Sequence, residues 1–64
     1  MSLGLLKYNA EVLADVVKKY ELLLEKRKKT NDADLEVQLK LLKGQIVFLL
    51  AAVKKEVDAY AASF

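Results

Sequence analysis

Residues 33–62 read ADLEVQLKLLKGQIVFLLAAVKKEVDAYAA, and this proline-free stretch decides the fold because its apolar residues recur at helical spacing. At 100° per residue, one set of them falls within an arc of about 100°. This first face comprises Leu35, Leu39, Leu42, Ile46, Leu49, Leu50, Val53, Val57, Tyr60 and Phe64. The stretch is therefore predicted to form one long helix with an apolar face directed at a neighbour.

The same stretch carries a second apolar face, centred about 120° from the first. Its members are Val37, Leu41, Phe48, Ala52 and Ala59. Gln38, Gln45 and Glu56 lie in the strip between the two faces. Because a single neighbouring helix covers one face only, the second face is left as an apolar patch that needs another partner.

An amphipathic pattern also fills the first half of the chain and predicts a helix over about residues 5–29. Its apolar stripe comprises Leu6, Ala10, Leu13, Val17, Tyr20 and Leu24, widened by Leu5, Val12, Val16 and Leu23. The basic run 26–29 suits the carbonyl end of a helix. We expect a turn at 30–32, in which Asn31 takes a left-handed conformation and Asp32 or Asn31 caps the helix of about 33–62.

So short a connection predicts an antiparallel hairpin, and the chain 1–64 is expected to be a single all-α domain. A chain of 64 residues buries too little apolar surface to be stable by itself, unless a disulfide, a bound metal or oligomerisation adds stability. We therefore expect two hairpins to pack as a homodimeric four-helix bundle with coiled-coil-like seams. A higher oligomer and a further protein partner remain open alternatives.

The predicted oligomer interface comprises residues of the second face and its border, with Phe48 as its aromatic anchor. Its residues are Val37, Leu41, Gly44, Gln45, Phe48 and Ala52. Gly44 costs about 1 kcal/mol relative to Ala in mid-helix, which favours a close helix crossing there. Gln45 is expected to meet its symmetry mate and fix the register, as buried polar residues do in coiled coils.

Composition argues against an enzyme and predicts no catalytic, cofactor or metal site. The chain has no Cys and no His, and its aliphatic hydroxyls are confined to the ends and the turn. The series Asp32, Asp34 and Glu36 begins like a calcium loop, but Val37 and Lys43 occupy the positions of its Gly and its bidentate Glu. We interpret these carboxylates as helix-capping groups.

No transmembrane segment is expected, because the longest apolar run, 46–53, is about 12 Å of helix and a bilayer core is about 30 Å thick. The absence of cysteine fits a cytoplasmic protein. The net charge of +2 does not by itself favour a polyanionic partner. Docking of the second face on a membrane surface is a third interpretation.

The hairpin, its length and its turn Asp32-Ala33-Asp34 resemble the Rop family, whose antiparallel hairpins dimerise into four-helix bundles and bind paired RNA loops. The resemblance implies an alternative function, a small RNA-binding regulator that contacts phosphates through cations of the first helix. The candidate cations are Lys18, Lys19, Lys26, Arg27, Lys28 and Lys29. The family's aromatic-centred RNA-binding face has no counterpart here, so no RNA-contact residue is transferred.

Overall fold

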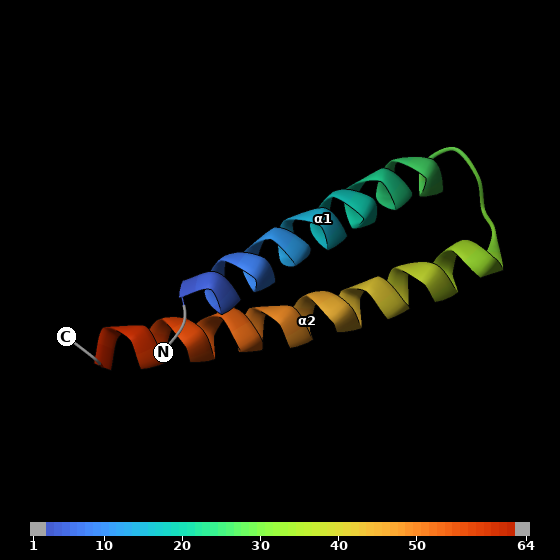
Figure 1. The fold of residues 1–64 in the computed structure, drawn as a ribbon. Helices are drawn as coiled ribbons and strands as arrows, with labels where there is room; N and C mark the ends of the chain where they lie inside the picture. The colour runs from blue at the N-terminus through green and yellow to red at the C-terminus, as the bar shows by residue number, and fades with distance from the viewer. Residues whose placement is uncertain (1–2, 63–64) are drawn as a thin grey trace.

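The computed structural model describes residues 3–62, which form two long helices joined by a short loop. Helix α1 spans Leu3–Arg27 and helix α2 spans Ala33–Ala62. Figure 1 shows the two helices running in opposite directions, with the loop at one end and the start of α1 and the end of α2 toward the other. The molecule measures 49 × 14 × 12 Å. The predicted all-α fold of two helices packed on each other is confirmed.

The end of α1 is fixed by the carbonyl of Lys26, which accepts three hydrogen bonds. Its donors are the backbone N–H of Lys29 at 3.0 Å, the backbone N–H of Thr30 at 3.1 Å and the Thr30 hydroxyl at 3.3 Å. Helix α1 therefore ends at Arg27, two residues before the expected end, and it also begins two residues before the expected start, at Leu3 instead of Leu5. The left-handed conformation expected of Asn31 is wrong, since no residue between 3 and 62 has a positive φ. Thr30 closes the last turn instead.

Helix α2 begins after Asp32, one of the two predicted caps. The Asp32 Oδ1 atom accepts a hydrogen bond from the backbone N–H of Asp34 at 2.9 Å, and the Asp32 carbonyl accepts one from Glu36 at 3.3 Å. These bonds satisfy N–H groups that have no partner within the helix. The carboxylates of Asp34 and Glu36 add negative charge where the helix dipole is positive.

The seam between the helices has the alternating spacing of a coiled coil. On α2 the buried and half-buried residues include a series with steps of four and three, Leu35, Leu39, Leu42, Ile46, Leu49, Val53, Glu56 and Tyr60. A series on α1 has steps of three and four, Leu6, Asn9, Leu13, Val16, Tyr20 and Leu23. Asn9 and Glu56 thus occupy seam positions that an apolar pattern does not reveal.

The seam also drifts around α2, and this corrects the predicted first face. Leu50 and Val57 were assigned to that face, yet about half of each side chain's surface is exposed. A repeat of 3.5 residues moves by about 20° per heptad across a straight helix of 3.6 residues per turn. Toward the C-terminal end the packed side therefore turns away from Leu50 and Val57 and takes in Ala52, which is half-buried.

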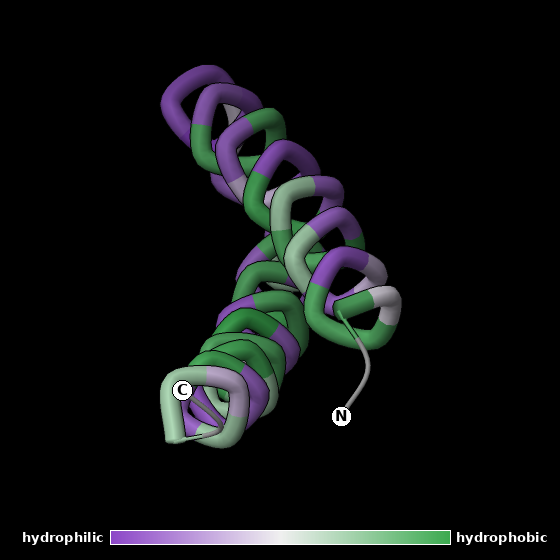
Figure 2. Tube along the Cα trace, turned by 60° about the vertical axis from the view of Figure 1, so that its left-hand side comes forward, coloured by the Kyte–Doolittle hydropathy of each residue, from purple (hydrophilic) through white to green (hydrophobic). Residues whose placement is uncertain are grey.

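The core of the hairpin is small. Among the described residues, only Val16, Leu35 and Leu39 fall below one tenth exposed, at 8%, 4% and 4%. A half-exposed ion pair between Arg27 and Glu36, 3.5 Å apart, links the helices beside the loop. Figure 2 shows the hydrophobic colouring concentrated on α2, whereas hydrophobic and hydrophilic residues alternate more evenly along α1. Much of the apolar surface of α2 consequently lies outside the hairpin seam.

Candidate interaction surface

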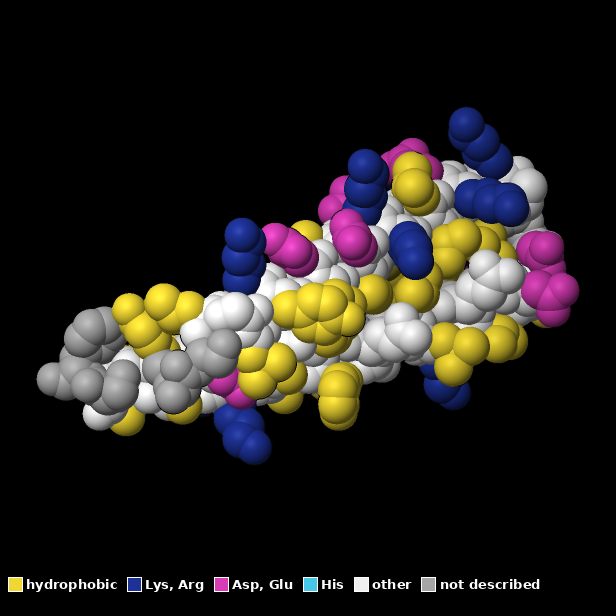
Figure 3. Space-filling view, in the orientation of Figure 1, with side chains coloured by type: hydrophobic (Ala, Val, Ile, Leu, Met, Phe, Trp, Pro, Cys, Tyr) yellow, Lys and Arg dark blue, Asp and Glu magenta, His cyan; other side chains and the backbone are white. Residues whose placement is uncertain are grey.

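The second face of α2 is open to solvent in the hairpin. Val37, Leu41 and Phe48 are 58%, 65% and 74% exposed, because α1 packs against the other side of α2. Figure 3 shows one side of the hairpin, with hydrophobic side chains gathered along the junction of the helices and over α2. The exposure of these three side chains matches the surplus apolar face predicted from the sequence.

This face forms one wall of a groove between the helices. The groove has a volume of about 490 Å³ and is lined by Leu41, Gly44, Gln45, Phe48 and Leu49 of α2 and by Val12 and Val16 of α1. A smaller depression of about 260 Å³, lined by Leu23, Gln38, Leu41, Leu42 and Gln45, shares two of these residues. We call the two together the α2 groove. Four of the six predicted interface residues line it.

Gly44 lies in the α2 groove, and the hairpin itself does not require a glycine there. A Cβ atom built on Gly44 meets nothing within 4 Å. The close helix crossing that the sequence predicts at this residue is therefore not the crossing of α1 and α2. Gln45, the next residue, is likewise exposed. Any close approach at Gly44 has to come from outside the hairpin.

The surface differs from the sequence-based prediction in two respects: two residues of α1 also line it, and one predicted interface residue is partly covered. Val12 and Val16 line the groove, although they were assigned only to the flank of the helix 1 stripe. The sequence feature that could have indicated this role is their position at the edge of the helix 1 stripe, because that edge borders the second face of α2. Ala52 is half-buried by the hairpin, unlike the other predicted interface residues, because the seam drifts toward it.

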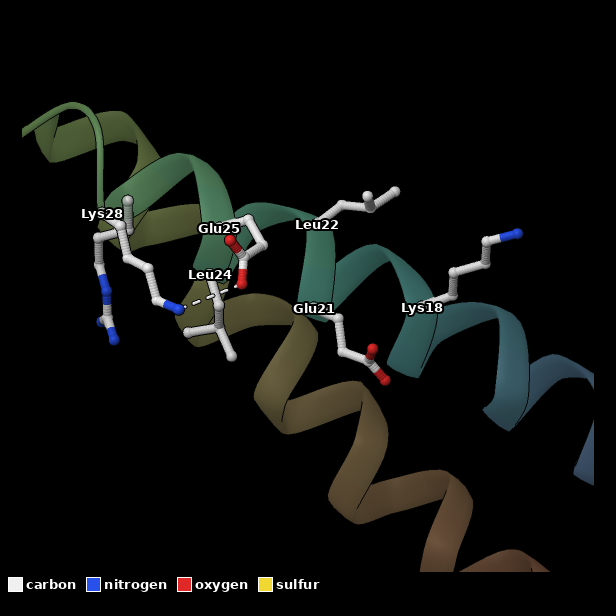
Figure 4. A pocket seen from close by; sticks show the side chains of 7 residues that line it. Lys18, Glu21, Leu22, Leu24, Glu25 and Lys28 are labelled. Carbon is white, nitrogen blue, oxygen red and sulfur yellow. Dashed lines mark hydrogen bonds and ion pairs between the residues drawn. The ribbon is translucent and has the colours of Figure 1, made fainter.

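A larger depression, about 600 Å³, lies away from this face. It is lined only by residues of α1 and by Lys28, which follows α1. Figure 4 shows its labelled side chains, with Lys18 and Leu22 pointing outward and Lys28 paired with Glu25 at 3.2 Å. Its side chains do not converge on a common point. A surface hollow of mixed charge along a single helix lacks the convergent polar groups of a ligand site.

The six candidate cations for nucleic-acid contact, Lys18, Lys19, Lys26, Arg27, Lys28 and Lys29, are all exposed. At 100° per residue, Lys19 and Lys26 share one side of α1, whereas Lys18 and Arg27 lie about 100° to either side of them. Arg27 pairs with Glu36 and Lys28 with Glu25. The helix thus spreads these charges around its circumference and does not gather them into a single stripe.

Within residues 3–62, no three or more carboxylates are grouped so that they could hold a metal ion. Neither α1 nor α2, as far as the structure describes them, combines the length and hydropathy of a membrane-crossing helix. The exposed carboxylate of Asp32 is engaged as the cap of α2.

No protein-family model, no curated protein and no solved structure matches the chain. The resemblance to the Rop family thus rests on the hairpin architecture and the three-residue turn alone.

Proposed function

We propose that this protein is a non-enzymatic assembly module, in which two copies of the hairpin pack into a four-helix bundle through the second face of α2. The observation that carries the proposal is the exposure of Val37, Leu41 and Phe48 beside the α2 groove. A contiguous apolar face of this kind on a small chain is typical of an interaction site. Buried aromatic side chains dominate the energetics of such contacts, which makes Phe48 the expected anchor.

The exposed area of the chain supports this proposal. The chain exposes 5150 Å², whereas a compact folded monomer of 7.2 kDa exposes about 4,100 Å². The excess, about 1,000 Å², is similar to the area of about 800 Å² that each partner buries in an interface of standard size. A second copy is thus large enough to cover the surplus surface of the first.

The small core gives an independent reason for assembly. With only Val16, Leu35 and Leu39 buried among the described residues, one hairpin gains little apolar burial to offset the conformational entropy of some sixty ordered residues. The chain has no cysteine that could supply a disulfide. Association of two hairpins adds burial without lengthening the chain.

The test uses two adjacent positions on α2 that are both apolar and similarly exposed in the hairpin. Phe48 lines the α2 groove, while Val47, 62% exposed, lies about 100° around α2, toward its charged side. We expect Phe48→Lys to abolish self-association, because the dimer would bury an unpaired charge. Val47→Lys is expected to leave association nearly unchanged.

Sedimentation equilibrium over a wide concentration range measures both variants against the unchanged chain. A mass of two chains that Phe48→Lys reduces to one, while Val47→Lys does not, supports the proposal. A folded monomer at every concentration overturns it. Equal effects of the two substitutions would show that association does not use the second face of α2.

A further inference from the structure

We infer that the two copies dock α2 against α2 in opposite directions, with the two-fold axis beside Gly44 and Gln45; this inference rests on the proposed function and gives the dimer its orientation. The arrangement follows from three properties of the exposed face of α2. They are the position of its glycine, the symmetric placement of its apolar side chains about that glycine, and the charges at the two ends of the face.

Gly44 marks the expected crossing point. A side chain there would meet nothing within the hairpin, so the missing Cβ leaves a gap that only an external partner can use. If the second α2 crosses at Gly44, the two glycines lie at the crossing and the backbones approach closely there. Away from that point the helices diverge and make room for side chains, as ridges and grooves require.

The residues of the face are arranged symmetrically about the midpoint between Gly44 and Gln45. Leu41 and Phe48 lie about 5 Å from this midpoint on either side, and Val37 and Ala52 lie about 11 Å from it, at 1.5 Å per residue. A two-fold axis at the midpoint therefore places Leu41 of one copy opposite Phe48 of the other. It likewise places Val37 opposite the smaller Ala52, so that apolar side chains face each other in both layers.

The ends of the face carry opposite charges at equal distances from the same midpoint. Asp34 and Lys55 each lie about 16 Å from it, and both are exposed. Among the described residues, neither side chain forms an ion pair within the hairpin, whereas Lys54, beside Lys55, pairs with Asp58 at 3.3 Å. The charges of Asp34 and Lys55 are thus available to a partner.

These charges distinguish the two directions of docking. When the copies run in opposite directions, Asp34 of each copy meets Lys55 of the other, and the dimer gains two ion pairs. When they run in the same direction, Asp34 meets Asp34 and Lys55 meets Lys55, which is unfavourable. The opposed dipoles of the two α2 helices favour the same choice.

Disulfide trapping measures the orientation directly, because the natural chain has no cysteine. Asp34→Cys and Lys55→Cys are mixed in equal amounts and oxidised, and the cross-linked products are identified by mass. We expect the mixed 34-to-55 product to dominate, since a disulfide requires Cα atoms roughly 4.4–6.8 Å apart. Predominance of 34-to-34 and 55-to-55 products would overturn the orientation.

Charge reversal supplies the second measurement without any cross-link. Lys55→Glu places like charges at both ends of an antiparallel dimer, and we expect its dissociation constant to rise roughly tenfold at low salt. Lys54→Glu is the control, because it changes the net charge equally and lies off the docking face. In a parallel dimer Lys55→Glu exchanges one like-charge pair for another and leaves association unchanged.

The failures of the two proposals are distinguishable. If the unchanged chain sediments as a monomer at every concentration, the assembly module and its orientation both fail. If it sediments as a dimer but gives same-site cross-links, or if Lys55→Glu has no more effect than Lys54→Glu, the assembly stands and the antiparallel docking is wrong.

Discussion

Gly44 is the residue at which the hairpin and the proposed dimer have opposite requirements. In the hairpin alone a methyl group at this position touches nothing, so Gly44→Ala should stabilise α2 by about 1 kcal/mol through helix propensity. In the dimer the same methyl group enters the closest approach of the two backbones. Overpacking of this kind costs about 1–3 kcal/mol.

We therefore predict that Gly44→Ala raises the helix content of the dilute chain and weakens its self-association by about fivefold or more. Circular dichroism at low concentration measures the first effect and sedimentation equilibrium the second. Tighter association together with raised helicity would mean that the partner does not approach α2 at Gly44.

Residue identity also explains why the end of α1 was misplaced. The basic run at 26–29 correctly indicates a helix C-terminus, but a charge effect that acts over a whole turn cannot select the last helical residue. That residue is selected by the Lys26 carbonyl, which accepts bonds from Lys29 and Thr30. The Thr30 hydroxyl is visible in the sequence, yet its bond depends on a local geometry that composition does not encode.

At the scale of the elements, the helix seam depends on buried leucines more than on charge pairs. Leu35→Ala should lower the free energy of unfolding by about 2 kcal/mol or more, because Leu35 is 4% exposed and its loss leaves a cavity. Glu36→Ala removes the half-exposed pair with Arg27 and should cost less than about 1 kcal/mol.

Urea denaturation followed by far-ultraviolet circular dichroism measures both changes. Leu22→Ala is the matched control, since Leu22 is 63% exposed on the outer side of α1 and its truncation should be nearly neutral. A larger loss from Glu36→Ala than from Leu35→Ala would contradict this assignment of the seam.

The elements were largely predictable from sequence because their signals are local. The spacing of apolar residues predicts both helices, and the Asp32 cap marks the start of α2 where the structure has it. The seam was less predictable, because it follows a 3.5-residue repeat that admits Asn9 and Glu56 and excludes Leu50 and Val57. The surplus of the second face was predictable, because one neighbouring helix covers one face only, whereas the groove that it forms with Val12 and Val16 depends on how the two helices pack.

At the scale of the whole molecule, the proposed contact between two hairpins contributes part of the core. The melting temperature should therefore depend on protein concentration. A hundredfold dilution lowers the contribution of association to the free energy of unfolding by about 2.7 kcal/mol. With the usual entropy of unfolding for two such chains, we expect the melting temperature to fall by about 10 °C. Calorimetry or circular dichroism at several concentrations measures the shift, and a melting temperature independent of concentration would indicate a monomer.

The two best-buried leucines, Leu35 and Leu39, lie in the first two turns after the loop. Closing that loop restricts only a few residues, so the strongest contacts of the hairpin are also the quickest to form. Toward the other end the packed residues of both helices are only half-buried, and local opening there exposes little new apolar surface. We therefore expect the two helices to begin pairing next to the loop, within microseconds, and to continue pairing away from it. Amide hydrogens far from the loop should then exchange with solvent faster than those beside Leu35 and Leu39.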